Sequence, residues 1–215
     1  MTIAVPWVRT LEELLELLES LAAVPGEADA LSELDHGLQC AYELSRVRPD
    51  DEELQIAGLV HDVGHRFGSA AGQSAAGESA AGESAAGESA AGESAAGQSA
   101  AGHSDAEHGA LGANCVGPLL GARVAGLVEA HVPAKRYLVT TDPAYGAVLS
   151  PCSVVSLERQ GGGMTPREVA EFEAGPYASD ATVLRRADDA AKVPARSVPA
   201  LHVWIPLLRQ MAAAR

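Results

Sequence analysis

The chain has 215 residues, of which 47% are hydrophobic and only 4% aromatic, and its formal net charge is −14. This length suits a single domain whose core is built mainly from Leu, Val and Ala. The acidic balance argues against nucleic-acid binding, because phosphates repel a negative surface. An anionic substrate would therefore need local positive charge within the site that binds it.

The sequence predicts neither membrane insertion nor export. Its apolar runs fall short of the ~18 residues that a membrane-spanning helix needs, and its N-terminus lacks the basic-then-apolar order of a signal peptide. Three scattered cysteines, Cys40, Cys115 and Cys152, form no CxxC pair, which argues against a zinc ribbon or a disulfide framework. We expect a reduced, cytoplasmic protein that binds neither nucleic acid nor a membrane, and the oligomeric state stays open.

Helical patterns fill the first third of the chain. The capping box Thr10-Leu-Glu-Glu13 opens an amphipathic helix that runs to about Leu21. A second helix is expected over about 28–47. The third is expected over about 52–67, after Pro49-Asp50-Asp51 has ended the second and provided a cap. Its middle is strongly apolar, so it should lie in the core.

A repetitive tract interrupts this pattern. Residues 69–103 are seven consecutive copies of the pentad Ser-Ala-Ala-Gly-X, in which X is Gln, Glu or His. A Gly at every fifth position costs a helix about 1 kcal/mol each time, and the tract has no large apolar residue to offset that cost. We predict a flexible surface insertion within a single domain that spans 1–215.

The rest of the chain is again helical in pattern. Helices are expected over about 105–120, 122–139, 180–192 and 199–211. Two further helices should begin after Ser150-Pro151 and at the capping box Thr165-Pro-Arg-Glu168, since both carry an N-cap residue followed by proline. Convincing runs of alternating strand residues are missing, and the predicted fold class is therefore all-α.

Four histidines and two aspartates on these helices form a candidate metal-binding set. Such a set suits two metal ions better than one, because each neutral imidazole offers one lone pair to one ion. A carboxylate has two oxygens and can bridge two ions, and Asp62, adjacent to His61, is the natural bridge. One ion would be completed by His36, His61 and Asp188, and the other by His108 and His131.

Five blocks of sequence carry a resemblance to a known family. The chain resembles the HD-domain superfamily and, within it, the oxygenase branch found with phosphonate-degradation operons. The HD dipeptide alone is weak evidence, whereas five matching blocks in the right order are specific. The blocks are LDHGLQCA (34–41), GLVHDVGH (58–65), AEHGALGA (106–113), HVPAKRYLVTTDPAYGAVLSP (131–151) and LRRADDAAKVP (184–194).

The resemblance implies an HD-domain helical bundle with a mixed-valence Fe(II)/Fe(III) centre bridged by Asp62. Such enzymes use O2 to break the C–P bond of a 1-hydroxy-2-aminoethylphosphonate, and the products are glycine and phosphate. Nitrogen and carboxylate ligands suit iron, although the same set could also hold Mn or Zn. The metal therefore cannot be identified from the ligand types alone.

The resemblance also implies which residues meet the substrate. His65 and Lys135 each lie one helical turn beyond a ligand and match positions that face the phosphonate, where they would also support catalysis. Glu27 matches a carboxylate that meets a substrate ammonium, and Arg185 would add positive charge. Weaker candidates for polar contacts share one face of a helix: Ser153, Ser156 and Gln160.

The chain departs from the family at two positions. Val24 replaces a tyrosine whose phenol can occupy an iron position until substrate arrives, and a valine cannot act as a ligand. Ala187 replaces a tryptophan before the aspartate pair. Of that pair we favour Asp188 over Asp189 as the ligand, from the alignment of LRRADD with the last aspartate of the superfamily.

Two other functions stay open at this point. One is a metal-dependent HD phosphohydrolase acting on a nucleotide or phosphate ester, in which a metal-bound hydroxide attacks phosphorus. Many simple phosphohydrolases need only the H…HD…D set, whereas His108, His131 and Lys135 suit the dinuclear oxygenase pattern. The other is a non-catalytic metal-binding or sensor protein, with which the missing tyrosine and the repeat insertion would agree.

Overall fold

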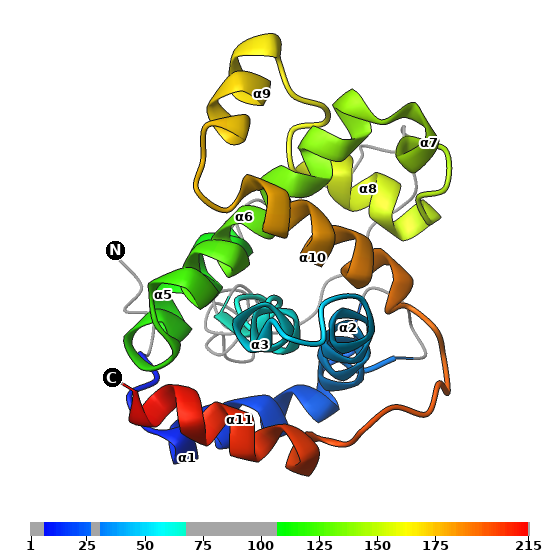
Figure 1. Cartoon of the computed structure of the whole chain (residues 1–215). Coiled ribbons are helices and arrows are strands. Elements are labelled where there is room, and N and C mark those ends of the chain that lie inside the picture. The colour runs from blue at the N-terminus through cyan, green and yellow to red at the C-terminus, as the bar shows by residue number, and fades with distance from the viewer. Residues whose placement is uncertain (1–6, 27–30, 68–106, 215) are drawn as a thin grey trace, which may run out of the picture.

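The computed structural model describes residues 7–26, 31–67 and 107–214, and in these ranges the regular secondary structure is helical (Figure 1). The prediction of an all-α fold is confirmed. An isolated antiparallel bridge between Pro25 and Ser32 is the β pairing recorded in the described ranges. The elements are α1 (Leu11–Ser20), the 3-10 turn η1 (Leu21–Ala23), α2 (Glu33–Val47), α3 (Glu52–Val60), α5 (His108–Leu120), α6 (Ala122–Thr141), α7 (Pro143–Gly146), α8 (Pro151–Arg159), α9 (Pro166–Glu173), α10 (Ala178–Ala190) and α11 (Leu201–Ala213).

Helix starts follow the capping residues in the sequence. Thr10 and Thr165 both form complete capping boxes, with the Glu three residues later bonding back to the cap backbone. The Ser150 hydroxyl accepts from the backbone N–H of Ser153, and Pro151 occupies the first turn of α8. These caps satisfy N–H groups that have no partner within the helix, which is why the sequence alone located them.

Two elements differ from the prediction. The third helix was expected to reach residue 67, but α3 ends at Val60 and turns occupy residues 61–64, with Val63 N bonded to Val60 O (3.3 Å) and His65 N to Asp62 O (3.0 Å). Residues 65–67 are helical again. The short α7 was not predicted; Asp142 caps its first turn and Pro143 begins it. The pair of residues at 61 and 62 therefore lies where α3 ends, not within a continuous helix.

Close backbone packing explains the turn after α3. Gly64 lies against the start of α5, and a Cβ built on it would come within 1.9 Å of the carbonyl oxygen of His108. Only glycine allows an approach of this kind. The turn is thereby held directly against the residue that opens α5.

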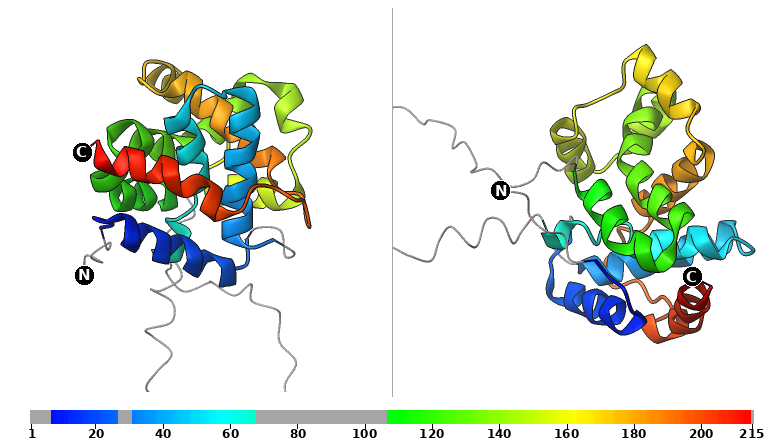
Figure 2. Two further views of the ribbon diagram at one scale, coloured as in Figure 1. Left: turned by 60° about the horizontal axis from the view of Figure 1, so that its bottom comes forward. Right: turned by 90° about the vertical axis from the view of Figure 1, so that its left-hand side faces the viewer.

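The helices surround a core built mainly from aliphatic side chains. Helices α2 and α3 run through the centre, α5 and α6 pack together beside them, and α10 lies across α2 and α6 (Figure 1). Helices α1 and α11 lie side by side and cover one end of the bundle (Figure 2). Fully buried leucines fill the space between these helices: Leu14, Leu18, Leu44, Leu54, Leu120, Leu127, Leu184 and Leu208.

Three predictions concern features that the described residues do not include or do not test. The repeat at 69–103 lies outside them, so the flexible insertion and the single domain over 1–215 stay predictions. Of the helices that the structure describes, none has the length and apolar character that crossing a bilayer requires. The cytoplasmic location also stays a prediction.

Candidate metal centre

The six predicted ligand residues lie together although they come from five parts of the chain. They are positioned by α2 (His36), the end of α3 (His61 and Asp62), the start of α5 (His108), the middle of α6 (His131) and the last turns of α10 (Asp188). All are buried except Asp62, whose side chain is 15% exposed. The bundle has thus gathered a cluster of polar groups in its interior.

Backbone carbonyls orient three of the imidazoles. The Nδ1 atom of His36 lies 3.2 Å from the carbonyl oxygen of Ala191, and that of His61 lies 2.8 Å from the carbonyl oxygen of Gly58. In α6, His131 Nδ1 contacts the preceding turn in the same way. A carbonyl oxygen only accepts, so each Nδ1 carries the proton and each Nε2 keeps a lone pair for the cluster.

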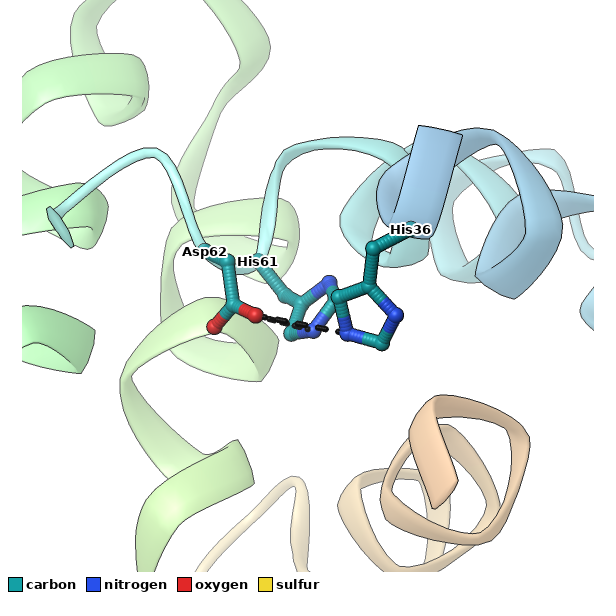
Figure 3. A group of neighbouring side chains, drawn as sticks. All are labelled: His36, His61 and Asp62. Atoms are coloured by element: carbon teal, nitrogen blue, oxygen red, sulfur yellow. Dashed lines mark ion pairs between the residues drawn. The ribbon is translucent and has the colours of Figure 1, made fainter. Parts of the chain in front are cut away.

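One half of the cluster joins His36 and His61 to the two aspartates, and Figure 3 shows the two imidazoles beside Asp62. His36 Nε2 lies 3.4 Å from Asp62 Oδ2 and 3.1 Å from Asp188 Oδ1. His61 Nε2 lies 3.1 Å from Asp62 Oδ2 and 3.6 Å from Asp188 Oδ2. Two ligand atoms bound at right angles to one ion, each at ~2.1 Å, are about 3 Å apart, so these spacings suit a shared cation.

The other half joins His108 and His131. Their Nε2 atoms are 2.9 Å apart, and each lies 3.5 Å from Asp62 Oδ1. Two lone pairs at this distance repel each other unless a proton or a cation lies between them. Asp62 presents Oδ2 to the first pair of histidines and Oδ1 to the second, which is the geometry that a bridging carboxylate requires.

The buried polar atoms of the cluster fit a metal ion. Within the described part of the chain, His36 Nε2, His61 Nε2 and Asp188 Oδ1 are buried and make no hydrogen bond. Buried polar groups normally have such partners, because leaving one unsatisfied is costly. Coordinated cations would satisfy these atoms, and the spacing and donor types of the residues fit that role.

Electrostatics also favour a cation here. Burial alone would lower the pKa of His36, but the carboxylates of Asp188 and Asp62 outweigh it and raise that pKa to about 9. Burial alone would raise the pKa of Asp62, but His61 and the other imidazoles hold it well below its usual value. The carboxylates therefore stay ionised and draw positive charge into the interior, which a proton or a metal ion can supply.

A second network fixes Asp188 from behind. Arg185 Nη1 lies 2.6 Å from Asp188 Oδ2, and the same guanidinium pairs with Asp189. The hydroxyl of Tyr145 donates to Asp189 Oδ2 at 2.5 Å. Asp188 faces the imidazoles while Asp189 faces Arg185 and Tyr145. The predicted substrate contact of Arg185 is untested, and this geometry assigns its charge to the two aspartates.

The predicted polar residues of α8 lie beside Lys135. The Lys135 side chain is buried, and its Nζ donates to the Ser156 hydroxyl. Ser153 Oγ accepts from Lys192 Nζ at 3.3 Å. Gln160 is buried, and its Oε1 has no hydrogen-bond partner in the described residues. This face of α8 therefore combines positive charge with polar groups.

A pocket of about 480 Å³ opens beside the cluster. Its wall includes His65 and Ser156, two predicted substrate residues, and His65 stacks on His108 with ring centroids 4.0 Å apart. Glu27, the predicted ammonium site, lies outside the described residues. The remaining lining residues are Pro25, Gly26, Glu33, Pro151, Cys152, Val155 and Arg159.

Glu33 and Arg159 on this wall were missed by the sequence analysis. Glu33 is buried, and burial together with the charge of Asp62 raises its pKa to about 7. Its position one helical turn before His36 was the available signal. Arg159 in the last turn of α8 offered none, because an exposed arginine at a helix end is common. Val24, at the position of the family tyrosine, packs against the hydrophobic core.

Two phosphonate dioxygenases are among the known proteins that resemble this chain. No family model matches the chain. The chain is 34% identical over 176 residues to a hydroxymethylphosphonate dioxygenase of Gimesia maris. The aligned residues cover 82% of this chain and 75% of that relative. The chain is also 36% identical over 100 residues to a glycine-betaine-forming [1-hydroxy-2-(trimethylamino)ethyl]phosphonate dioxygenase of Leisingera caerulea, covering 46% of this chain and 51% of that protein.

A third relative is an uncharacterized protein of Acanthamoeba polyphaga mimivirus, 36% identical over 85 residues, covering 40% of this chain and 39% of the relative. The helical bundle and its buried histidine–aspartate cluster define the class as HD-domain proteins. Within this class, the chain belongs to the family of HD-domain phosphonate dioxygenases.

Proposed function

We propose that this protein is an O2-dependent di-iron oxygenase that breaks the C–P bond of a small 1-hydroxyphosphonate. The observation that carries the proposal is the placement of Asp62, whose two oxygens face two separate pairs of imidazole nitrogens. The relatives support the reaction, because both named ones are phosphonate dioxygenases. A substrate of the 1-hydroxy-2-aminoethylphosphonate type would yield phosphate and an amino acid.

The ligands divide between two sites that share Asp62. His36, His61 and Asp188 would hold one ion, and His108 and His131 the other. Iron suits these nitrogen and oxygen donors; bound there, it would supply Lewis acidity toward the substrate oxygens and electrons for O2. Arg185 contributes by holding Asp188 in place, since its guanidinium already pairs with that carboxylate and its neighbour.

Positive groups beside the pocket bind the phosphonate in this proposal. His65 lines the pocket, and the Lys135 ammonium reaches the wall through Ser156. Lys135 supplies the local positive charge that a chain of net charge −14 needs for an anionic substrate, and the His65 ring offers an N–H donor. They would also stabilise the charge on phosphorus as the C–P bond breaks. Ser153, Ser156 and Gln160 offer further polar contacts.

Coupled product measurements test the proposal. The protein is loaded with Fe(II) under anaerobic conditions and then given O2 with hydroxymethylphosphonate or 1-hydroxy-2-aminoethylphosphonate. We expect phosphate release and O2 uptake in equal amounts with at least one of them. Release of phosphate from a phosphomonoester without O2 uptake would instead show a phosphohydrolase. Because changes behind a metal ligand already cost 10–100-fold, His61→Ala should lose more than about 100-fold of the rate, and exposed His202→Ala should not change it.

A further inference from the structure

Tyr145 is a buried tyrosine on α7, the short helix between α6 and α8 in the chain. Its hydroxyl donates to Asp189 Oδ2 at 2.5 Å. Burial raises the pKa of this phenol, so the hydroxyl keeps the proton that it donates. A buried tyrosine is normally placed where a partner satisfies its hydroxyl. Here that partner directly follows the predicted ligand Asp188, so the contact lies at the edge of the metal centre.

Contacts around Tyr145 hold α7 against α10. Asp142 accepts from the backbone N–H groups of Ala144 at 3.1 Å and of Tyr145 at 3.2 Å, which caps the first turn of α7. From α10, the Arg186 guanidinium donates to Asp142 Oδ2 at 2.7 Å and lies over the Tyr145 ring, 5.4 Å from its centroid. The cap and the cation–π contact therefore present the tyrosine hydroxyl to α10 in a fixed position.

From Asp189 the contacts continue to the predicted ligand. Arg185 Nε donates to Asp189 Oδ2 at 3.1 Å, and this is the same oxygen that accepts from Tyr145. At the other end of the guanidinium, Arg185 Nη1 lies 2.6 Å from Asp188 Oδ2. Both Arg185 and Asp188 are buried, so solvent screens these contacts very little. The hydroxyl on α7 is thus connected to Asp188 through two charged side chains.

Tyr145 and Arg185 share one oxygen of Asp189. Without the hydroxyl, that oxygen would interact with the guanidinium alone and draw it away from Asp188, because the donors of an arginine form a rigid fork. Groups behind a metal ligand fix its orientation and tune its affinity for the ion. Removing one hydroxyl from α7 should therefore loosen the carboxylate of Asp188.

We infer that Tyr145 is a positioning residue that acts through Asp189 and Arg185 on Asp188. It strengthens the binding of the ion that Asp188 helps to hold and has little influence on the other. Helix α7 thereby takes part in the metal centre, although the six ligands come from other elements. The inference rests on the proposed function for the division of the ligands between two ions.

Tyr145→Phe removes only the hydroxyl and provides the test. Fe(II) binding is measured without O2 by competition with a chelator. In a His108→Ala background, which keeps the ion held by Asp188, we expect Tyr145→Phe to weaken binding about 10-fold, and in a His36→Ala background by less than about 3-fold. Tyr137→Phe is the matched control, because its hydroxyl donates to Glu173 at 2.9 Å at an exposed site. The control should leave both affinities unchanged.

A double-mutant cycle separates positioning from a general loss of stability. Asp189→Asn removes the charge through which Tyr145 acts on Arg185, so Tyr145→Phe should have no further effect on Fe(II) affinity in that background. Thermal unfolding of the metal-free variants should show one cooperative native transition in each. Additive losses in the cycle, or equal weakening of both ions by Tyr145→Phe, would overturn the inference.

The same binding data distinguish this inference from the proposed function. Selective weakening of one ion in a protein that consumes no O2 with any hydroxyphosphonate would refute the proposed reaction and support the role of Tyr145. O2-dependent phosphate release by a Tyr145→Phe protein with unchanged affinity for both ions would support the reaction and overturn the role of Tyr145.

Discussion

Replacing Asp62 with alanine should remove both metal ions from the protein. Asp62 Oδ2 lies beside His36 and His61, and Oδ1 lies beside His108 and His131. Without this carboxylate, the second pair of imidazoles would have to hold its ion with neutral donors only. We expect the metal content, measured by elemental analysis after dialysis, to fall from about two ions per chain to nearly none.

Single changes on either side of Asp62 provide the comparison. His36→Ala should weaken one site and His108→Ala the other, so each should retain more metal than Asp62→Ala. The exposed His202→Ala is the neutral control. If Asp62→Ala lost no more metal than His108→Ala did, the two sites would not share this carboxylate.

Replacing Arg185 with methionine should destabilise the fold strongly. The Arg185 side chain is 4% exposed and pairs with both Asp188 and Asp189. Its removal leaves the buried Asp188 carboxylate without its main counter-charge, and breaking a buried ion pair in this way typically costs about 3–5 kcal/mol. The free energy of unfolding, measured by urea denaturation of the metal-free protein, should fall by that amount.

The neighbouring arginine of α10 is a matched control. Arg186 pairs with Asp142 at 2.7 Å, but its side chain is 51% exposed. Solvent screens such a pair, so Arg186→Met should cost much less stability than Arg185→Met. Similar losses for the two variants would contradict the buried role assigned to Arg185.

Local signals in the sequence explain why most helices were predicted. The capping boxes at Thr10 and Thr165 satisfy N–H groups within one turn, so no distant contact is needed to locate those helices. The end of α3 depends instead on the approach of Gly64 to the backbone of His108, a contact between segments separated by the repeat. A pattern read along one helix contains no information about that approach.

The residues of the site also differ in whether the sequence alone could predict their roles. The ligand candidates could be recognised from the sequence because histidine and aspartate are residue types that bind metal ions. The pairs of Arg185 with Asp188 and Asp189 lie about one turn apart within α10 and could have been predicted from the sequence. The burial of Arg185 and the contact of Tyr145 with Asp189 could not, because they depend on distant parts of the chain packing against α10. Glu33 became a candidate only once its burial and its place on the pocket wall were known.

Electron paramagnetic resonance of the half-oxidised, iron-loaded protein tests the central claim most directly. Two irons bridged by Asp62 should give the signal of a magnetically coupled Fe(II)/Fe(III) pair, and that signal should change when a hydroxyphosphonate is added. Asp62→Ala should lose it. A spectrum of isolated, uncoupled Fe(III) that does not change when the substrate is added would contradict the shared two-metal centre.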